Sequence, residues 1–304
     1  MTLNNGLRLA LLLSMAMVVG GCGSTQTSSK PAIDNVELRN TEMDVLFATE
    51  FPVADKSDAM TRAAEAWSSG DINRALFFYV RALQFDSEDV DLLAGIGKIH
   101  HSQDRSEMAV RAFSMALRVD ADYAPALEGR GLILLANGRG DLAEVDLRRA
   151  VTISPTAWRA HNGLGLLADQ RGDHSIAKEH YDAALAIVPE SALVLNNRGY
   201  SSFLAGEYSS ASADLHIAAD RLGYKRAWIN LGAVYSRQGR YIPAVDMYSK
   251  VLSEAQTFNK VAEAAMANND YETAQRLLEK AIYESPTYFP AAEENLSLLN
   301  LHMQ

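Results

Sequence analysis

The sequence predicts an all-α fold, a solenoid of about seven helix–turn–helix repeats. Three observations predict it: alanines recur at near-constant intervals, a second row of small residues follows the first, and glycine or a similar residue interrupts each interval. Self-similarity at a period of 20 to 50 residues is the signature of repeat architectures. The chain has 304 residues and only 8 prolines, so its composition allows a large helical core.

The first row of alanines sets the period, with separations of 34, 34, 34, 34, 33 and 30 residues. This row is Ala75, Ala109, Ala143, Ala177, Ala211, Ala244 and Ala274. Seven residues further on, the second row is Ala82, Ala116, Ala150, Ala184, Ala218, Val251 and Ala281. A bulky residue stands between the rows in each repeat, at Tyr79, Phe113, Leu147, Tyr181, Leu215, Tyr248 and Leu278.

Small residues upstream of each turn complete the pattern of a helix pair. They are Ala63, Gly97, Gly131, Gly165, Gly199, Gly232 and Ala262. We expect them to let the two helices of a repeat approach closely, with the bulky residue filling the gap. The predicted turns carry Gly70, Asp104, Gly138, Gly172, Gly206, Gly239 and Asn269, residue types that accept the left-handed conformation at a helix end. Pro155, Pro189, Gly223 and Pro286 separate successive repeats.

The segment "WINLGAVYSRQGRYIPAVDMYSKVL", Trp228 to Leu252, resembles the 34-residue tetratricopeptide repeat, which has Trp, Leu-Gly, Tyr, Ala, Phe, Ala and Pro at fixed places. The resemblance implies a right-handed superhelical solenoid. Its repeats are predicted at 56–89, 90–123, 124–157, 158–191, 192–224, 225–254 and 255–288. The segment 289–304, with "PAAEENLSLLNLHM", is predicted to form a C-terminal capping helix, which repeat arrays need.

Two departures from the repeat carry structural expectations. Repeat one lacks both Trp and Leu-Gly and has Ala59 and Arg62-Ala63 instead, as is common in terminal repeats. Four residues are missing between repeats six and seven, which corresponds to about one helical turn. We therefore expect a shortened helix pair near Ser253 to Asn259 and a local change of curvature.

The N-terminal segment 1–21 is predicted to be an export signal. An apolar run up to Val19 has one cation, Arg8, near its start and closes on small residues, and it is too short to span a membrane. Val19-Gly20-Gly21-Cys22 resembles a bacterial lipobox, which implies that Cys22 carries a diacylglyceryl thioether and an N-acyl chain such as palmitate. Gly23 in place of Asp implies the outer membrane, periplasmic face. An ordinary cleaved signal with an accidental cysteine is the alternative.

The segment 22–55 is predicted to be a lipidated, largely disordered tether. It begins "CGSTQTSSKPAIDNVELRN" and shows little helical periodicity, and such polar composition favours a linker over a packed layer. The segment Thr41 to Phe51 is apolar enough to dock on the repeats that follow.

Composition and motif searches exclude several function classes. The net charge of −10 leaves no basic footprint for nucleic acid, and the single cysteine excludes an internal disulfide and a multi-cysteine zinc site. The glycine pairs within the predicted first helices recur with the repeat, so packing explains them better than a dinucleotide turn. The seven histidines show no metal-ligand spacing and are interpreted as surface or groove residues: His100, His101, His161, His174, His180, His216 and His302. We expect no cofactor, no metal, no catalytic residue and no enzyme.

The expected binding surface is the concave face that the first helices of a solenoid line. Residues at the family's contact positions form the predicted peptide-binding groove: Arg159, Asn162, Asn196, Asn197, Tyr200, Phe203, Arg226, Asn230 and Arg237, with Lys98, His101, Leu166 and Asp169 at further positions. Asparagine both donates and accepts, so a row of asparagines suits a peptide backbone, and aromatic residues supply apolar anchors. The alternative is that the asparagines only cap or bridge neighbouring helices.

A lipobox followed by such repeats is similar to the pilotin lipoproteins, most closely to the TadD family of Flp (tight adherence) pilus assembly lipoproteins. The resemblance implies a noncatalytic scaffold that binds a protein partner in the envelope, such as a secretin or another pilus assembly component. An adaptor for peptidoglycan enzymes or periplasmic proteases is the alternative of the same build. An enzyme is disfavoured because the search found no catalytic motif.

Overall fold

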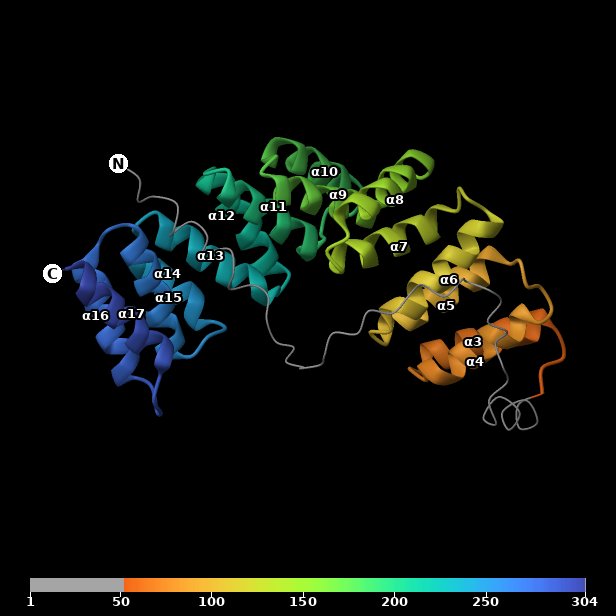
Figure 1. The fold of residues 1–304 in the computed structure, drawn as a ribbon, viewed down its shortest axis with the longest axis horizontal. Coiled ribbons are helices and arrows are strands. Elements are labelled where there is room, and N and C mark those ends of the chain that lie inside the picture. The colour runs from red at the N-terminus through yellow and green to blue at the C-terminus, as the bar shows by residue number, and fades with distance from the viewer. Residues whose placement is uncertain (1–51, 304) are drawn as a thin grey trace, which may run out of the picture. The chain divides into compact units, whose positions relative to one another are not determined.

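The computed structural model describes residues 52–303. In this range every regular element is a helix, which confirms the predicted all-α class (Figure 1). No helix in the described range is both long and apolar enough to cross a membrane. The predicted export signal, Cys22 and the segment Thr41 to Phe51 lie outside the described residues, so the predictions about them stay predictions.

The helices follow one another as seven pairs and a final single helix. The first four pairs are α3 (Lys56–Ser68) with α4 (Ile72–Leu83), α5 (Val90–Ser102) with α6 (Ser106–Val119), α7 (Ala124–Ala136) with α8 (Gly140–Ile153), and α9 (Trp158–Arg171) with α10 (His174–Ile187). The others are α11 (Ala192–Leu204) with α12 (Tyr208–His216) and its extension η1 (Ile217–Arg221), α13 (Lys225–Arg237) with α14 (Tyr241–Ser249), α15 (Glu254–Ala267) with α16 (Tyr271–Tyr283), and α17 (Pro290–His302).

The turn inside each pair is the predicted one. All seven residues that were expected to adopt a left-handed conformation have positive φ, including the two that are not glycine, Asp104 at 58° and Asn269 at 61°. Asparagine and aspartate tolerate this conformation better than other residues with a Cβ. The helix pairs of the seven repeats therefore turn at equivalent places.

Close helix packing explains the small residues of the first helices. A Cβ on Gly165 would lie 2.6 Å from the ring of Tyr181, and a Cβ on Gly97 would lie 2.8 Å from the ring of Phe113. Gly129, in the next repeat, faces the same Phe113 ring at 2.4 Å. The bulky residue of one repeat thus fills the space that glycines leave on two successive first helices.

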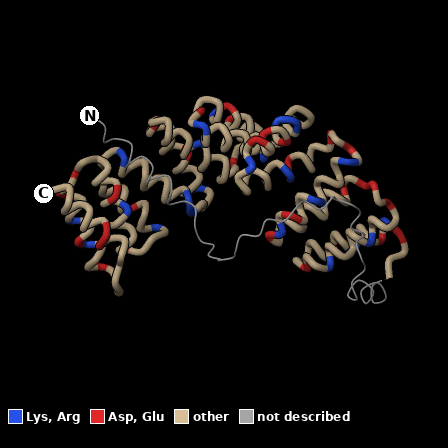
Figure 2. Tube along the Cα trace, viewed as in Figure 1, with Lys and Arg blue, Asp and Glu red and all other residues tan. Residues whose placement is uncertain are grey.

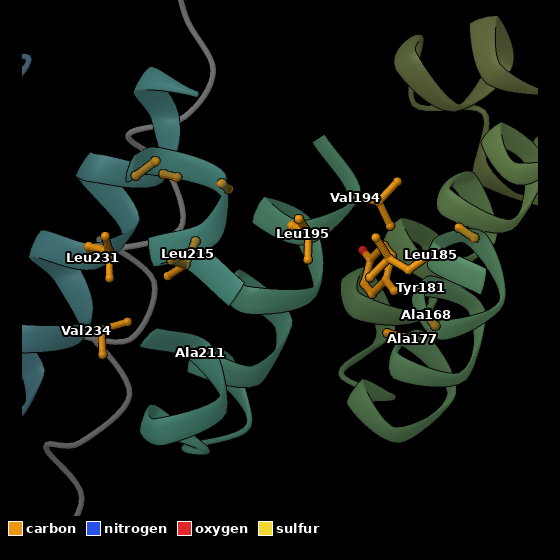
Figure 3. Close-up of a cluster of buried hydrophobic side chains, with 14 residues drawn as sticks. Ala168, Ala177, Tyr181, Leu185, Val194, Leu195, Ala211, Leu215, Leu231 and Val234 are labelled. Atoms are coloured by element: carbon orange, nitrogen blue, oxygen red, sulfur yellow. The ribbon is translucent and has the colours of Figure 1, made fainter. Parts of the chain in front are cut away.

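The core is continuous from one pair to the next. The first-row alanines are fully buried in all seven repeats. Figure 3 shows part of the cluster around Tyr181, Leu215 and Leu231, which joins α9 through α13. Since each side chain packs against its own repeat and a neighbour, burial of apolar surface stabilises the array junction by junction.

The shortening between repeats six and seven lies elsewhere than predicted. Helix α15 has 14 residues and begins with a capping box at Ser253, so no shortened pair lies near Ser253 to Asn259. The loss falls on α14, which has 9 residues where α6, α8 and α10 have 14 each. The second-row position Val251 follows the end of α14 and is only half-buried. The missing residues therefore shorten the C-terminal end of α14 and leave α15 at full length.

Both ends of the described chain are tied to the array. At the start, the Asp55 side chain caps α3 by accepting from the Asp58 backbone N–H, and Val53 packs against the core. The last residues of the predicted tether are therefore described, and they cap helix α3 and pack against it. At the other end, Ala292 and Leu299 of α17 are fully buried against α16 and α15, as expected of a capping helix.

Candidate functional site

The predicted groove lies on the first helices α9, α11 and α13, and its asparagines contact one another. Asn197 Nδ2 donates to Asn162 Oδ1 at 2.9 Å, and Asn230 Nδ2 donates to Asn196 Oδ1 at 2.8 Å. Asn162 and Asn196 are only 5% and 6% exposed. The asparagines therefore bridge successive first helices, which is the alternative considered from the sequence.

The asparagine bridge retains some capacity for a ligand. In the described chain, Asn162 Nδ2 and Asn230 Oδ1 take no part in the side-chain bonds of the bridge. A similar bond joins Asn295 Nδ2 of α17 to Asn259 Oδ1 of α15 at 3.0 Å, outside the predicted groove. Because the same kind of bond occurs outside the predicted groove, the geometry establishes that these asparagines bridge helices.

Two aromatic residues of α11 form an apolar patch. The rings of Tyr200 and Phe203 lie with their centroids 5.9 Å apart, and Tyr208 of α12 lies 6.1 Å from Phe203. Tyr200 and Phe203 are half-buried. Burial raises the pKa of Tyr200, and the nearby Asp169 carboxylate raises it further. Neutral aromatic side chains that are partly exposed on a helix face are suitable anchors for a protein ligand.

Asp169 stands at one of the further contact positions of the predicted groove. Its carboxylate bonds to side chains of repeats four and five instead of facing the groove freely. Its carboxylate accepts hydrogen bonds from Tyr181 at 2.8 Å and Ser201 at 2.6 Å, and it pairs with His174 Nδ1 at 2.8 Å. Burial raises the pKa of Tyr181, and the Asp169 charge adds to the effect. Asp169 thus joins α9, α10 and α11 through buried polar contacts.

Cations and one carboxylate face a common surface across three repeats. Burial raises the pKa of Glu128 on α7, while Arg159 on α9 and Lys98 on α5 oppose that rise. The Arg159 guanidinium also stacks over the Trp158 ring, 4.4 Å from its centroid. Glu128 was not predicted as a groove residue, although it stands at the same position of its repeat as Asn162.

The other predicted groove residues do not gather at one point. Arg226 and Arg237 are exposed at opposite ends of α13, about 16 Å apart along the axis at 1.5 Å per residue. His101 is exposed on α5 and Leu166 is half-buried on α9. The candidate site is therefore an elongated face over several first helices, without a closed pocket.

Sequence reasoning missed two half-buried arginines in place of the repeat's leucine. Arg198 forms a bidentate ion pair with Asp214, with both hydrogen bonds at 2.7 Å, and also donates to Asp182 at 2.6 Å. Arg130 makes the same contact with Asp146 at 2.7 and 2.8 Å and donates to Ser114 at 3.2 Å. These charge-assisted bonds hold the pKa of Arg198 above its usual value. The signal was present, since an aspartate stands 16 residues after each arginine.

One of the seven histidines, His100, is not the surface or groove residue that the sequence predicted. His100 is buried, with only 8% of its surface exposed, and burial lowers its pKa, so it is no surface residue. His161 and His180 face each other with their Nδ1 atoms 3.4 Å apart. Burial lowers the pKa of both rings, and each stays neutral more readily than a free histidine. No cluster of three or more metal-ligating side chains occurs among residues 52–303.

The charge distribution is mixed over the described helices. Figure 2 shows Lys and Arg interspersed with Asp and Glu along most of the array, without one extended basic face. Some ion pairs are local, such as Lys178 with Asp182 one helical turn away, and others join separate helices, such as Arg171 with Glu144. A mixed surface of this kind suits protein partners through local charge complementarity.

Comparisons with known proteins match the geometry. Tetratricopeptide-repeat family models match residues 95–157, 146–192 and 162–215, and a second such model matches 225–258. A search of curated proteins finds no match.

Three solved structures illustrate the likeness in fold. A tetratricopeptide repeat protein from Parabacteroides merdae is 17% identical with a TM-score of 0.56, covering 81% of this chain and 98% of that one. PilW is 18% identical with a TM-score of 0.57, covering 69% and 98%. PilF from Pseudomonas aeruginosa is 17% identical with a TM-score of 0.53, covering 71% and 98%. With its repeats, turns and packing shared, this chain belongs to the tetratricopeptide-repeat family, whose arrays are scaffolds that bind protein partners.

Proposed function

We propose that this chain is a pilotin-like scaffold of the outer membrane that binds a protein partner and assists assembly of a Flp (tight adherence) pilus or its secretin. The fold likeness to PilW, a widely conserved type IV pilus biogenesis factor, carries the proposal. The lipobox-like residues before Cys22 support the same location. Within this proposal the repeats supply the binding face and the lipid holds it at the periplasmic side of the membrane.

The anchor is tested by Cys22→Ser in the full chain. We expect the variant to fold, because Cys22 lies outside the helices that the structure describes, but to leave the membrane fraction. Fractionation of cells and metabolic labelling with palmitate measure both effects. Retention of Cys22→Ser in the membrane pellet of a strain that lacks the captured partner contradicts a lipid anchor at this residue.

The binding face is proposed to be the predicted groove in a revised form. Tyr200 and Phe203 are the apolar anchors, and the exposed cations Arg159, Arg226 and Arg237 lie on the first helices α9 and α13. Asn162, Asn196, Asn197 and Asn230 hold the helices in register, which leaves Asn162 Nδ2 and Asn230 Oδ1 for the ligand. An extended peptide suits this face because a polar row beside an apolar patch can hold main chain and side chains separately.

Tyr200→Ala tests the groove. Its hydroxyl has no hydrogen-bond partner among residues 52–303, so its removal takes away contact area at modest cost to stability. We expect at least about tenfold weaker capture of the partner, since a central aromatic anchor contributes 1 to 2 kcal/mol or more. Tyr283→Ala, an exposed tyrosine of α16, is the matched control. Equal capture by the wild type and Tyr200→Ala contradicts the groove.

The partner is identified by crosslinking in intact envelopes, followed by mass spectrometry. A secretin or pilus assembly protein among the products supports the proposal. Enrichment of cell-wall synthases, hydrolases or proteases instead identifies the chain as an adaptor of the alternative kind.

A further inference from the structure

A cavity of about 330 Å³ lies where α14 ends early. Its walls are the first turns of α13 and the segment that follows α14: Lys225, Arg226, Ile229, Ser249, Lys250, Val251 and Leu252. Helix α10 of repeat four runs six residues past its bulky Tyr181, whereas α14 ends one residue past the equivalent Tyr248. Helix α14 ends at Ser249, so the segment that follows it, Lys250 to Leu252, forms one wall of this cavity.

The cavity combines three cations with an apolar wall. Neither Lys225 nor Arg226 has an ion-pair or hydrogen-bond partner in the described part of the chain, and both are exposed. Lys250 has only a long contact to Asp246, 3.7 Å between exposed groups, which contributes little. Three cations at one cavity, in a chain of net charge −10, are an uncompensated local charge.

The equivalent place in repeat four has the opposite character. There a cavity of about 700 Å³ is lined by Trp158, Val188, Pro189, Glu190 and Ser191. It includes a carboxylate and no cation, and a complete helix α10 precedes it. The basic character is thus a property of repeat six, since the repeat fold alone does not produce it.

We propose that this cavity binds an acidic segment of a protein partner, in which Asp or Glu side chains lie next to an apolar residue. Arg226 and Lys225 contact the carboxylates, since guanidinium and carboxylate groups form strong charge-assisted bonds. Ile229, Val251 and Leu252 receive the apolar side chain, which removes their exposed surface from water. Arg226 also belongs to the proposed groove, so the acidic segment lies at one end of the peptide that the groove holds.

This inference rests on the proposed function only in that the occupant is a protein. A helical partner or a lipid headgroup would use the charges differently. A lipid headgroup needs no apolar side chain beside its phosphate, and a helix, about 10 to 12 Å across with its side chains, is too wide for a cavity of about 330 Å³. A short extended segment fits both the charge and the volume.

The test uses the purified full chain in detergent and two fluorescein-labelled octapeptides. In one, two glutamates alternate with two leucines between Gly-Ser ends, and in the other both glutamates are glutamine. Fluorescence anisotropy at low salt should show at least about tenfold tighter binding of the acidic peptide, a difference of one charge-assisted contact. Added NaCl should weaken it, because exposed charges are screened.

The variants locate the binding. Lys225→Gln with Arg226→Gln should reduce the preference for the acidic peptide about tenfold, and Ile229→Gln should weaken the binding of both peptides. Arg118→Gln, which changes an exposed arginine of α6 outside both sites, should leave the binding of both peptides unchanged. Helix content of each variant is checked by circular dichroism, and all four positions are exposed, so folding is retained.

The outcomes separate this inference from the proposed function. Equal binding of the two peptides, or an unchanged preference in the Lys225 and Arg226 double variant, overturns the acidic site. If capture of the partner still depends on Tyr200 in that case, the groove stands and only the cavity fails. Binding of anionic lipid vesicles that is lost in the double variant, with no peptide preference, also overturns it in favour of a lipid surface.

Discussion

Repeats four and six share one motif but differ in how their helix pairs close. In repeat four, α10 has 14 residues and the buried Tyr181 donates to the carboxylate of Asp169. In repeat six, α14 has 9 residues, and the uncharged Ser236 stands where Asp169 stands, beside Tyr248. Burial raises the pKa of Tyr248 to about 12. Repeat four therefore joins its helices through a buried tyrosine–aspartate hydrogen bond, whereas repeat six has neither that aspartate nor the last turn of its second helix.

Asp169→Ala should have the largest effect on stability. It leaves the hydroxyls of Tyr181 and Ser201 buried without their acceptor, and we expect a loss of about 2 to 4 kcal/mol. Ser236→Ala, the same position in repeat six, should cost under about 1 kcal/mol. Urea unfolding followed by circular dichroism measures both. Similar losses for the two variants would remove the contrast between the repeats.

Arg198→Leu restores the leucine that repeats four and six carry, yet it should destabilise repeat five. Asp214 would stay buried at 8% exposure without its guanidinium, at a cost of about 2 to 3 kcal/mol. Replacing Asp214 by Leu as well should recover much of the loss. Thermal unfolding of the single and double variants measures the coupling, and additive losses would show that the pair acts as two independent residues.

Asn197→Ala removes one bond of the asparagine bridge and should cost about 1 kcal/mol. The equivalent change at the end of the array, Asn295→Ala, should cost less, because α17 has a neighbour on one side only. Native-state hydrogen exchange of α11 and α17 resolves the two effects locally. A larger opening at α11 than at α17 sharpens the contrast between inner and terminal junctions, and the reverse order would contradict it.

The His161 and His180 pair should give the smallest effect, a dependence of stability on pH. Burial lowers both pKa values in the folded chain, so the unfolded chain binds protons more readily as the pH falls below about 7. The free energy of unfolding should therefore fall between pH 7.5 and pH 5.5. His180→Gln should lessen that fall, measured as the melting temperature at the two pH values. An unchanged pH profile in the variant would mean that other groups dominate.

The helix pairs could be predicted because small residues and turns are local signals. The alanine rows, the residue at each left-handed turn and the close approach of Gly165 to Tyr181 all follow from side-chain size and backbone preference. The position of the shortening could not be predicted, because a deletion in the sequence does not say which of two adjoining helices gives up its last turn. The alignment pointed to Ser253 to Asn259, whereas α14 ended early.

The polar network was beyond the sequence for a different reason. Asp169 and Asn196 occupy first-helix positions that were expected to face a ligand, and only the packed geometry shows that their partners lie on neighbouring helices. The asparagines illustrate this well, since a ligand-binding row and a helix-bridging row have the same spacing. The aromatic pair of Tyr200 and Phe203 could be foreseen, because residues three apart on a helix are neighbours.

The arginine pairs have a consequence for how the chain finds its fold. Seven look-alike helix pairs can dock in the wrong order while the polypeptide is being made, because alanines and glycines fit almost any neighbour. Only α8 and α12 carry an aspartate at the place that receives the arginine, at Asp146 and Asp214, while α14 has Met247 there. An Arg198 side chain docked on α14 would meet Met247 instead of a carboxylate, so the charge penalises that wrong pairing.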